Sequence, residues 1–146
     1  MANEKKKERV EVLEYALCGR GYSGRGVRMR ELPADERNEI LSEVALALGK
    51  DASMIAYQLA CVTACVQRMI VQVTEAKGLA DAAAVHTATW IDVTAFELQS
   101  GPQSYKKLFN AKDDALLAQI YRTGHEVGHG DAELVMGKAI PVVLGE

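Results

Sequence analysis

Aromatic residues are scarce in this sequence, at 5% of 146 residues, and it holds only three histidines and three prolines. With so few rings, the core must consist mostly of Ala, Val, Leu, Ile and Met, which favours helices with some strand. Apolar residues at 49% and charged residues at 25% are ordinary globular values, so wholesale disorder is excluded. The length fits one domain, and we expect a flexible charged arm at 1–9 followed by a single domain at 10–146.

Cysteine is also too rare for a disulfide framework. The count of three is odd, which indicates free thiols in a reducing compartment. Cys61 and Cys65 are four residues apart, so on a helix they would share a face and could supply half of a metal site. Their neighbours are Ala, Val and Met, and the favoured interpretation is two small buried side chains.

The sequence has no long hydrophobic run. The longest stretch without a charge, 52–67, has 16 residues and contains Ser, Thr and Gln, so it is too short and too polar to span a bilayer. We expect a buried helix there. The charged N-terminus lacks the features of a secretory signal, so we expect a cytoplasmic protein with no membrane partner.

Charge is distributed unevenly along the chain. Residues 1–30 carry eight basic and four acidic groups, a balance of +4, whereas residues 31–146 carry nine and sixteen, a balance of −7, which together give the net −3. The basic end could contact nucleic acid or an acidic partner, but a solvated arm at 1–9 is the favoured interpretation.

The N-terminal third predicts a hairpin and then a helix. Alternating residues at 10–17 and 27–32 predict two short strands, joined across the glycine-rich loop CGRGYSGRG at 18–26. Pro33 suits the first turn of a helix, and Gly49 is a natural stop. Apolar residues recur at helical spacing between them: Ile40, Leu41, Val44 and Leu48.

The strongest periodic pattern predicts a central core helix from about Asp51. Its stripe has spacings of 4, 3, 4, 3 and 4 and consists of Ile55, Leu59, Val62, Val66, Met69 and Val73. Residues 69–74 would also serve as a strand, and 78–88 could be helix or loop. We predict a strand at 89–98, a turn at 100–104, and a helix capped by Asn110 that buries Leu116, Leu117, Ile120 and Tyr121. A short helix is expected at 131–139. The predicted fold class is therefore α-rich α+β, with central amphipathic helices and a small antiparallel β element.

One segment matches a zinc-protease motif, H-E-x-x-H, at 125–129. On a helix, His125 and His129 could bind one zinc ion while Glu126 activates water. The extended form of the motif needs Gly and His where this chain has Ala132 and Val135. His86 is the only other histidine, and Glu133 would lie on the same helix. Glycines at 124, 128 and 130 also weaken a helix. The favoured interpretation is structural, with no catalytic, metal or cofactor residue.

A second motif, G-x-G-x-x-G, spans 19–24. A dinucleotide site needs a helix directly after it, but the sequence that follows is extended and ends in Pro33, so a hairpin loop is favoured. Four arginines and Tyr22 lie between 20 and 30 and could contact phosphates. A nucleic-acid partner is nevertheless not expected.

Two stretches resemble a known family. VRMRELPADERNEIL at 27–41 is similar to the N-terminal pattern of tailed-phage tail assembly chaperones, and KKLFNAKDDALLAQIYRTGHEV at 106–127 is similar to their C-terminal helix. The two cover about a quarter of the chain. The resemblance implies a small cytosolic α-rich protein of virion assembly that is not an enzyme and binds the tape-measure protein and tail-tube subunits. It implies no site residues.

Two function hypotheses follow. The first is a non-enzymatic phage-type tail assembly or structural protein whose partners are protein subunits of the tail, and which could also form a homo-oligomer. The alternative is a small zinc-dependent metalloprotease-like protein that uses His125, Glu126 and His129. The metal content of the purified protein separates them.

Overall fold

The computed structural model describes residues 8–101, 104–122, 133–134 and 140–144 of the chain. In order, its first half contains β1 (Glu8–Leu17), β2 (Arg25–Arg30), α1 (Ala34–Leu48), α2 (Met54–Met69) and β3 (Ile70–Thr74). Then follow α3 (Ala82–His86), β4 (Trp90–Asp92), α4 (Val93–Ser100), the 3₁₀ helix η1 (Ser104–Leu108), α5 (Ala111–Arg122), β5 (Glu133–Leu134) and β6 (Ile140–Leu144). The predicted α-rich α+β class is confirmed.

The described strands form one antiparallel sheet in the order β4-β3-β2-β1-β5, and β6 also pairs with β1. The predicted hairpin of 10–17 with 27–32 is confirmed, with Tyr15 opposite Val27. β1 begins at Glu8, so the last two residues of the expected arm, Glu8 and Arg9, belong to this strand. Val12 pairs with Arg30 and also with Ile140, which shows that β6 lies on the edge of β1 opposite to β2.

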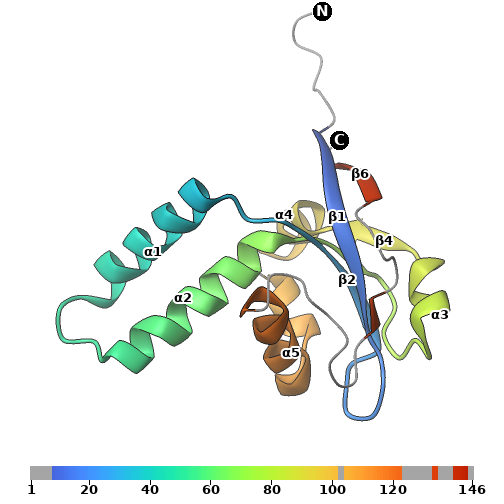
Figure 1. Cartoon of the computed structure of the whole chain (residues 1–146). Helices are drawn as coiled ribbons and strands as arrows, with labels where there is room; N and C mark the ends of the chain where they lie inside the picture. The colour runs from blue at the N-terminus through green and yellow to red at the C-terminus, as the bar shows by residue number, and fades with distance from the viewer. Residues whose placement is uncertain (1–7, 102–103, 123–132, 135–139, 145–146) are drawn as a thin grey trace, which may run out of the picture.

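The two faces of the sheet have different covers. One face carries Tyr15, Val27 and Met29, which pack with residues of α2 and α5 in the main core. The other carries Ala16 and Cys18, which pack against Val85 of α3 in a smaller cluster. In Figure 1 the α1–α2 hairpin projects from the sheet, with α5 beside α2 and α3 at the far side of the sheet.

Local signals account for the helices. Pro33 precedes α1, and Gly49 ends it with a φ of 82°, so both predicted boundaries are confirmed. Ser53 accepts a hydrogen bond from the Ala56 amide at the start of α2. At the start of α5, the Asp113 amide donates to the Asn110 side chain (2.9 Å) and the Asn110 amide donates to the Asp113 carboxylate (3.1 Å), which confirms Asn110 as the cap.

Three expectations are corrected. The segment 89–98 is not one strand, because β4 ends at Asp92, opposite Gln72 of β3, and α4 begins at Val93. The helix expected at 131–139 is wrong at Glu133 and Leu134, which pair with β1 as β5; residues 131–132 and 135–139 lie outside the described residues.

The third correction concerns α2. The helix ends at Met69 and β3 follows directly, so of the two alternatives for 69–74 the strand is the one observed, at Ile70–Thr74. Burial is restricted to its C-terminal half, where Cys61, Cys65, Val66 and Met69 lie in the core. Its N-terminal half is exposed, so the interpretation of 52–67 as a buried helix is wrong there. In α1, similarly, Ile40 is the expected residue that is buried, whereas Leu48 is 40% exposed.

Candidate protein-interaction surface

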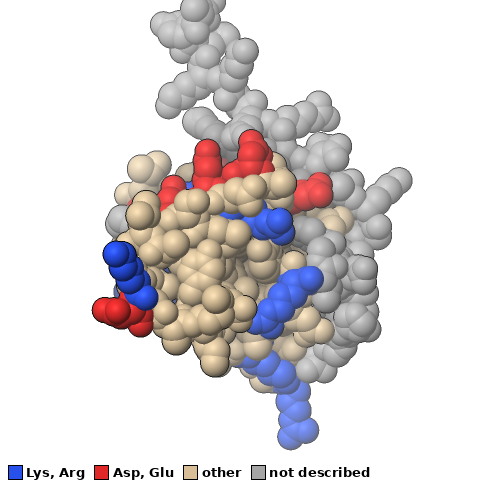
Figure 2. Space-filling view, turned by 60° about the vertical axis from the view of Figure 1, so that its left-hand side comes forward, with Lys and Arg blue, Asp and Glu red and all other residues tan. Residues whose placement is uncertain are grey.

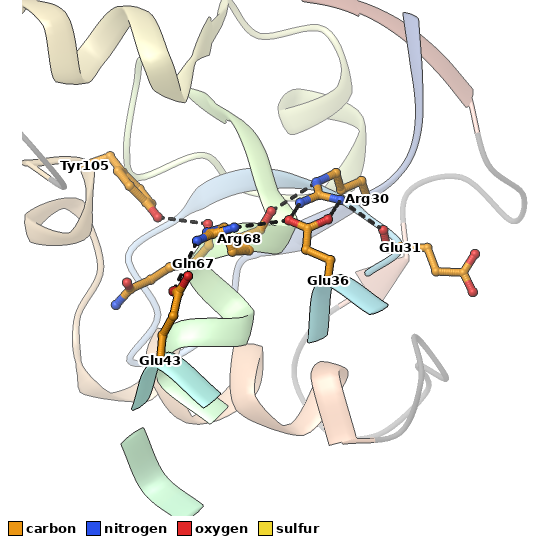
Figure 3. A network of polar contacts seen from close by, with 7 residues as sticks. All are labelled: Arg30, Glu31, Glu36, Glu43, Gln67, Arg68 and Tyr105. Atoms are coloured by element: carbon orange, nitrogen blue, oxygen red, sulfur yellow. Dashed lines mark hydrogen bonds and ion pairs between the residues drawn. The ribbon is translucent and has the colours of Figure 1, made fainter. Parts of the chain in front are cut away.

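A network of charges fixes the base of the α1–α2 hairpin to the sheet. Glu36, at the start of α1, accepts two hydrogen bonds from Arg30 of β2 (2.7 and 3.1 Å). Arg68, at the end of α2, reaches the same carboxylate at 3.3 Å and Glu43 at 3.7 Å. The Arg30 Nε also donates to the Arg68 carbonyl (3.1 Å). Figure 3 shows Glu36 between the two arginines. Both ends of the hairpin are therefore held at one point.

This environment changes the acidity of Glu36. Hydrogen bonds from Arg30 hold the pKa of Glu36 below its ordinary value of 4.5, with a smaller contribution from Arg68. The side chain is 26% exposed, so solvent screens part of the interaction. The network positions the hairpin rather than offering a free charge to a ligand.

Large apolar side chains lie in solvent on the outer part of the hairpin. Met54 is 67% exposed, Ile55 70% and Leu59 57%. Ile55 and Leu59, here called the ridge, belong to the same stripe of α2 as the core residues Val62 and Val66. In the sequence, no charge lies between Asp51 and Arg68. Figure 2, turned toward the side from which the hairpin projects, shows an area of uncharged residues with acidic side chains along its upper margin and basic side chains around and below it.

The ridge leads into a groove between α2 and the η1–α5 segment. This groove has a volume of about 200 Å³, and its apolar lining includes Val62, Val66, Phe109 and Leu117. Lys106 and Asp114 bring one charge of each sign to it. Burial and the neighbouring Asp113 raise the pKa of Asp114, while Lys106 opposes the rise. An apolar convex surface and an apolar concave surface thus follow one another along α2.

A smaller hollow marks the tip of the hairpin. It has a volume of about 170 Å³, and its lining includes Leu48 from the end of α1 and Met54 and Tyr57 from the start of α2. The Tyr57 hydroxyl lies 3.5 Å from the Leu41 carbonyl, which connects the two helices behind the hollow. The tip therefore offers an apolar depression with an exposed methionine at its edge.

A cavity larger than these two, of about 470 Å³, lies between the hairpin, β3 and α4. Its charged lining includes Arg30 and Arg68, which already contact Glu36, and Glu97 of α4. Tyr105 donates to the Gln67 carbonyl (3.1 Å), and burial together with the charge of Glu97 raises the pKa of Tyr105 to about 12. A phenol of such weak acidity remains protonated at neutral pH.

A second polar network crosses the opposite face of the sheet. Glu14 is fully buried and contacts Arg28 at 2.7 Å and the His86 Nδ1 at 2.8 Å. Arg28 also donates to Gln72 (2.8 Å) and stacks over Trp90, 4.0 Å from the ring centre. The row continues because Gln72 donates to Asp92 (2.7 Å). These residues contact one another across four strands, and through His86 they hold α3 against the sheet.

The zinc-motif residues His125, Glu126 and His129 lie outside the described residues. The third histidine, His86, makes the 2.8 Å contact with Glu14 described above. Among the residues that the structure describes, no group of three or more His, Cys, Asp or Glu side chains could hold a metal ion. Cys61 and Cys65 are buried with free thiols, as the sequence predicted.

The glycine-rich loop at 19–24 connects β1 to β2, so the expected hairpin loop is confirmed and no helix follows it. Gly24 has a φ of 80°, and a side chain there would collide with the backbone of Gly78. Arg25 donates to the carbonyls of Thr74 (2.8 Å) and Glu75 (3.0 Å). Arg28 and Arg30 have the acidic partners already named. Most arginines of this segment therefore hold the fold together, which argues against a nucleic-acid surface.

Sequence reasoning missed both the ridge as a surface and the polar row on the sheet. The row had a signal, because Glu14, Arg28 and Gln72 alternate with apolar residues that face the core. The ridge had none, because its spacing is that of any buried helix. Comparison with known proteins adds no relative: no family model, curated protein or solved structure matches the chain. Within the described segments, no helix has the length and apolar character needed to cross a membrane.

Proposed function

We propose that this protein is a non-enzymatic assembly protein of the tailed-phage type, which binds other protein subunits of a tail. The observation that carries the proposal is the exposure of large apolar side chains on a hairpin that is anchored at its base and free at its tip. Met54 is 67% exposed beside the tip hollow, and α2 carries no charge from its first residue until Arg68. Exposed apolar surface of this kind typically marks a protein-binding site.

The chemistry of the surface favours an amphipathic helix as the partner element. A helix presents apolar side chains at intervals of three and four residues, and such side chains fit a shallow hollow between two helices. The tape-measure and tube subunits implied by the family resemblance are the partners of this proposal. The two charged networks described above, around Glu36 and around Glu14, support the proposal indirectly, because their side chains bind one another.

The test is co-purification. We expect the full chain, co-expressed with a tail tape-measure protein, to be recovered in complex with that protein. Met54→Asp places a charge at the tip hollow and should reduce recovery of the complex by tenfold or more, on the order of a hot-spot residue. Leu98→Asp is the matched control, since Leu98 is 88% exposed on α4, which does not line the tip hollow. Equal binding by both variants would refute the tip as the docking surface.

A further inference from the structure

We propose that the ridge and the groove of α2 bind a second copy of this chain, so that the isolated protein is a two-fold symmetric dimer. This inference goes beyond the binding of tail subunits, because it concerns the ridge and the groove instead of the tip. It assigns a partner to the largest exposed apolar side chains of α2 after Met54, namely Ile55 (70%) and Leu59 (57%).

The ridge and the groove are complementary in shape. The ridge is convex and the groove is concave, and both lie on the same face of one helix, with Ile55 and Leu59 directly before Val62 and Val66. In a two-fold interface each contact occurs twice, so if the ridge of one copy contacts the groove of the other, the reverse contact also forms. Two α2 helices lying antiparallel therefore place each ridge in the partner's groove. A cavity of roughly 150 Å³ accommodates benzene. The groove, at about 200 Å³, can accept an aliphatic side chain.

The charges near the ridge and the groove are also complementary. The α2 helices themselves bring no charge into the contact, because the sequence is uncharged from Ala52 to Gln67. The groove is lined by Lys106 together with Asp114, and the neighbouring Tyr105 donates to the carbonyl of Gln67, the α2 residue of the lining that is farthest from the ridge along the helix. Asp51 is exposed four positions before Ile55. In the antiparallel arrangement the residues before one ridge lie beside the far end of the partner's groove, so Asp51 faces the partner's Lys106. The same pair forms twice, once at each end.

The ridge is also continuous with the main core. Val62 and Val66 pack against the main core beside Phe109, Leu116 and Leu117. The ridge is the same stripe at the point where α5 no longer covers it. Within one chain, the walls of the groove cover the C-terminal half of α2. A second copy covers the ridge in the same way, with its own α2, η1 and α5.

The experiment is sedimentation equilibrium of the isolated full-length protein at concentrations up to about 100 µM. Wild type is expected to be a dimer. Ile55→Glu puts a carboxylate into the apolar groove and should raise the dimer dissociation constant by roughly thirtyfold or more. Leu98→Glu changes a leucine of α4 that is even more exposed, at 88%, and should leave the dimer intact. Far-UV circular dichroism verifies that each variant is folded.

A charge exchange tests the orientation. Asp51→Lys and Lys106→Asp each place like charges opposite one another and should weaken the dimer several-fold, whereas the double variant restores the pair and the affinity. A wild-type monomer at the highest concentration, or equal effects of Ile55→Glu and Leu98→Glu, would overturn the dimer. Lack of rescue by the double variant would overturn the antiparallel arrangement. A monomer that still captures the tape-measure protein through Met54 would leave the proposed function standing.

Discussion

Replacing Arg28 with Met should remove a large part of the stability of the fold. The side chain of Glu14 is 0% exposed, and Arg28, at 15% exposure, holds its Oε1 with two contacts of 2.7 Å. Removing one partner of a buried ion pair typically costs about 3–5 kcal/mol, because the other charge stays buried. His86 still reaches the Oε2 at 2.8 Å, which places the expected cost near the lower end of that range.

The magnitude includes a second, smaller effect. Arg28 also donates to Gln72 at 2.8 Å, and loss of an ordinary hydrogen bond costs about 1 kcal/mol. We therefore expect Arg28→Met to lower the free energy of unfolding by about 3–4 kcal/mol, and the thermal midpoint by roughly 10 °C. For a domain with a total stability of about 5–15 kcal/mol, this is a severe loss.

The assay is urea denaturation followed by circular dichroism and by the fluorescence of Trp90, the single tryptophan. Because Arg28 lies 4.0 Å from the ring centre, the emission reports directly on this region. The double variant Glu14→Met/Arg28→Met removes both charges and should recover to within about 2 kcal/mol of wild type. A single variant within about 1 kcal/mol of wild type, or a double variant less stable than the single one, would refute the reasoning.

Three further predictions concern other parts of the molecule. Gly26→Ala should lower the free energy of unfolding by about 1–3 kcal/mol in thermal or urea unfolding, because its Cβ would lie 2.3 Å from Val85 Cγ1; a wild-type midpoint would contradict this. Because the folded pKa of Glu36 is lowered, its ion pair adds stability above the ordinary pKa of 4.5 and loses it as pH falls through the folded pKa. The stability difference between wild type and Glu36→Gln, about 1 kcal/mol or less in urea titrations, should therefore shrink in acid, and a constant difference would disprove it. Protein purified without chelator should contain substoichiometric zinc by elemental analysis; one zinc per chain, lost in His125→Ala or His129→Ala, would establish the metalloprotease alternative.

The elements that the sequence predicted correctly are those specified by nearby residues. The β1–β2 hairpin follows from alternation on both sides of a glycine loop, and α1 follows from Pro33, its periodicity and Gly49. The cap of α5 is a contact between Asn110 and Asp113, three positions apart. In each case the interacting groups lie within one hairpin or one helical turn, so a short window contains the whole signal.

The errors occur where a distant segment decides the structure. At 89–98 the alternation is compatible with a strand, but β3 offers pairing only as far as Asp92, and Val93 is then buried as the first residue of a helix. Glu133 and Leu134 pair with β1, more than a hundred residues earlier in the chain. No local pattern can indicate that an open strand edge is present there.

The candidate surface likewise has one part that nearby residues specify and one part that distant segments specify. The stripe of α2 was predictable from its spacing, and its direction toward the core is correct at Val66 and Met69. Exposure of Ile55 and Leu59 depends on how far the cover by α5 extends along α2. Apolar residues on the same face of α2, such as Ile55 and Val66, therefore differ in burial only because of the tertiary structure. For this reason the exposed surface cannot be recognised from the sequence.

The position of β1 in the sheet has a consequence for folding. This strand precedes the other described strands in the chain, yet its second edge pairs with β6, where Glu8 lies opposite Leu144, 136 positions later. Such distant contacts slow folding, because a long loop must close before the pairing of the two strands stabilises the structure. Until β6 docks, the part of the outer edge of β1 that it covers stays unpaired. An unpaired edge invites pairing with other chains. A folding intermediate that lacks β6 is therefore the species most prone to aggregation.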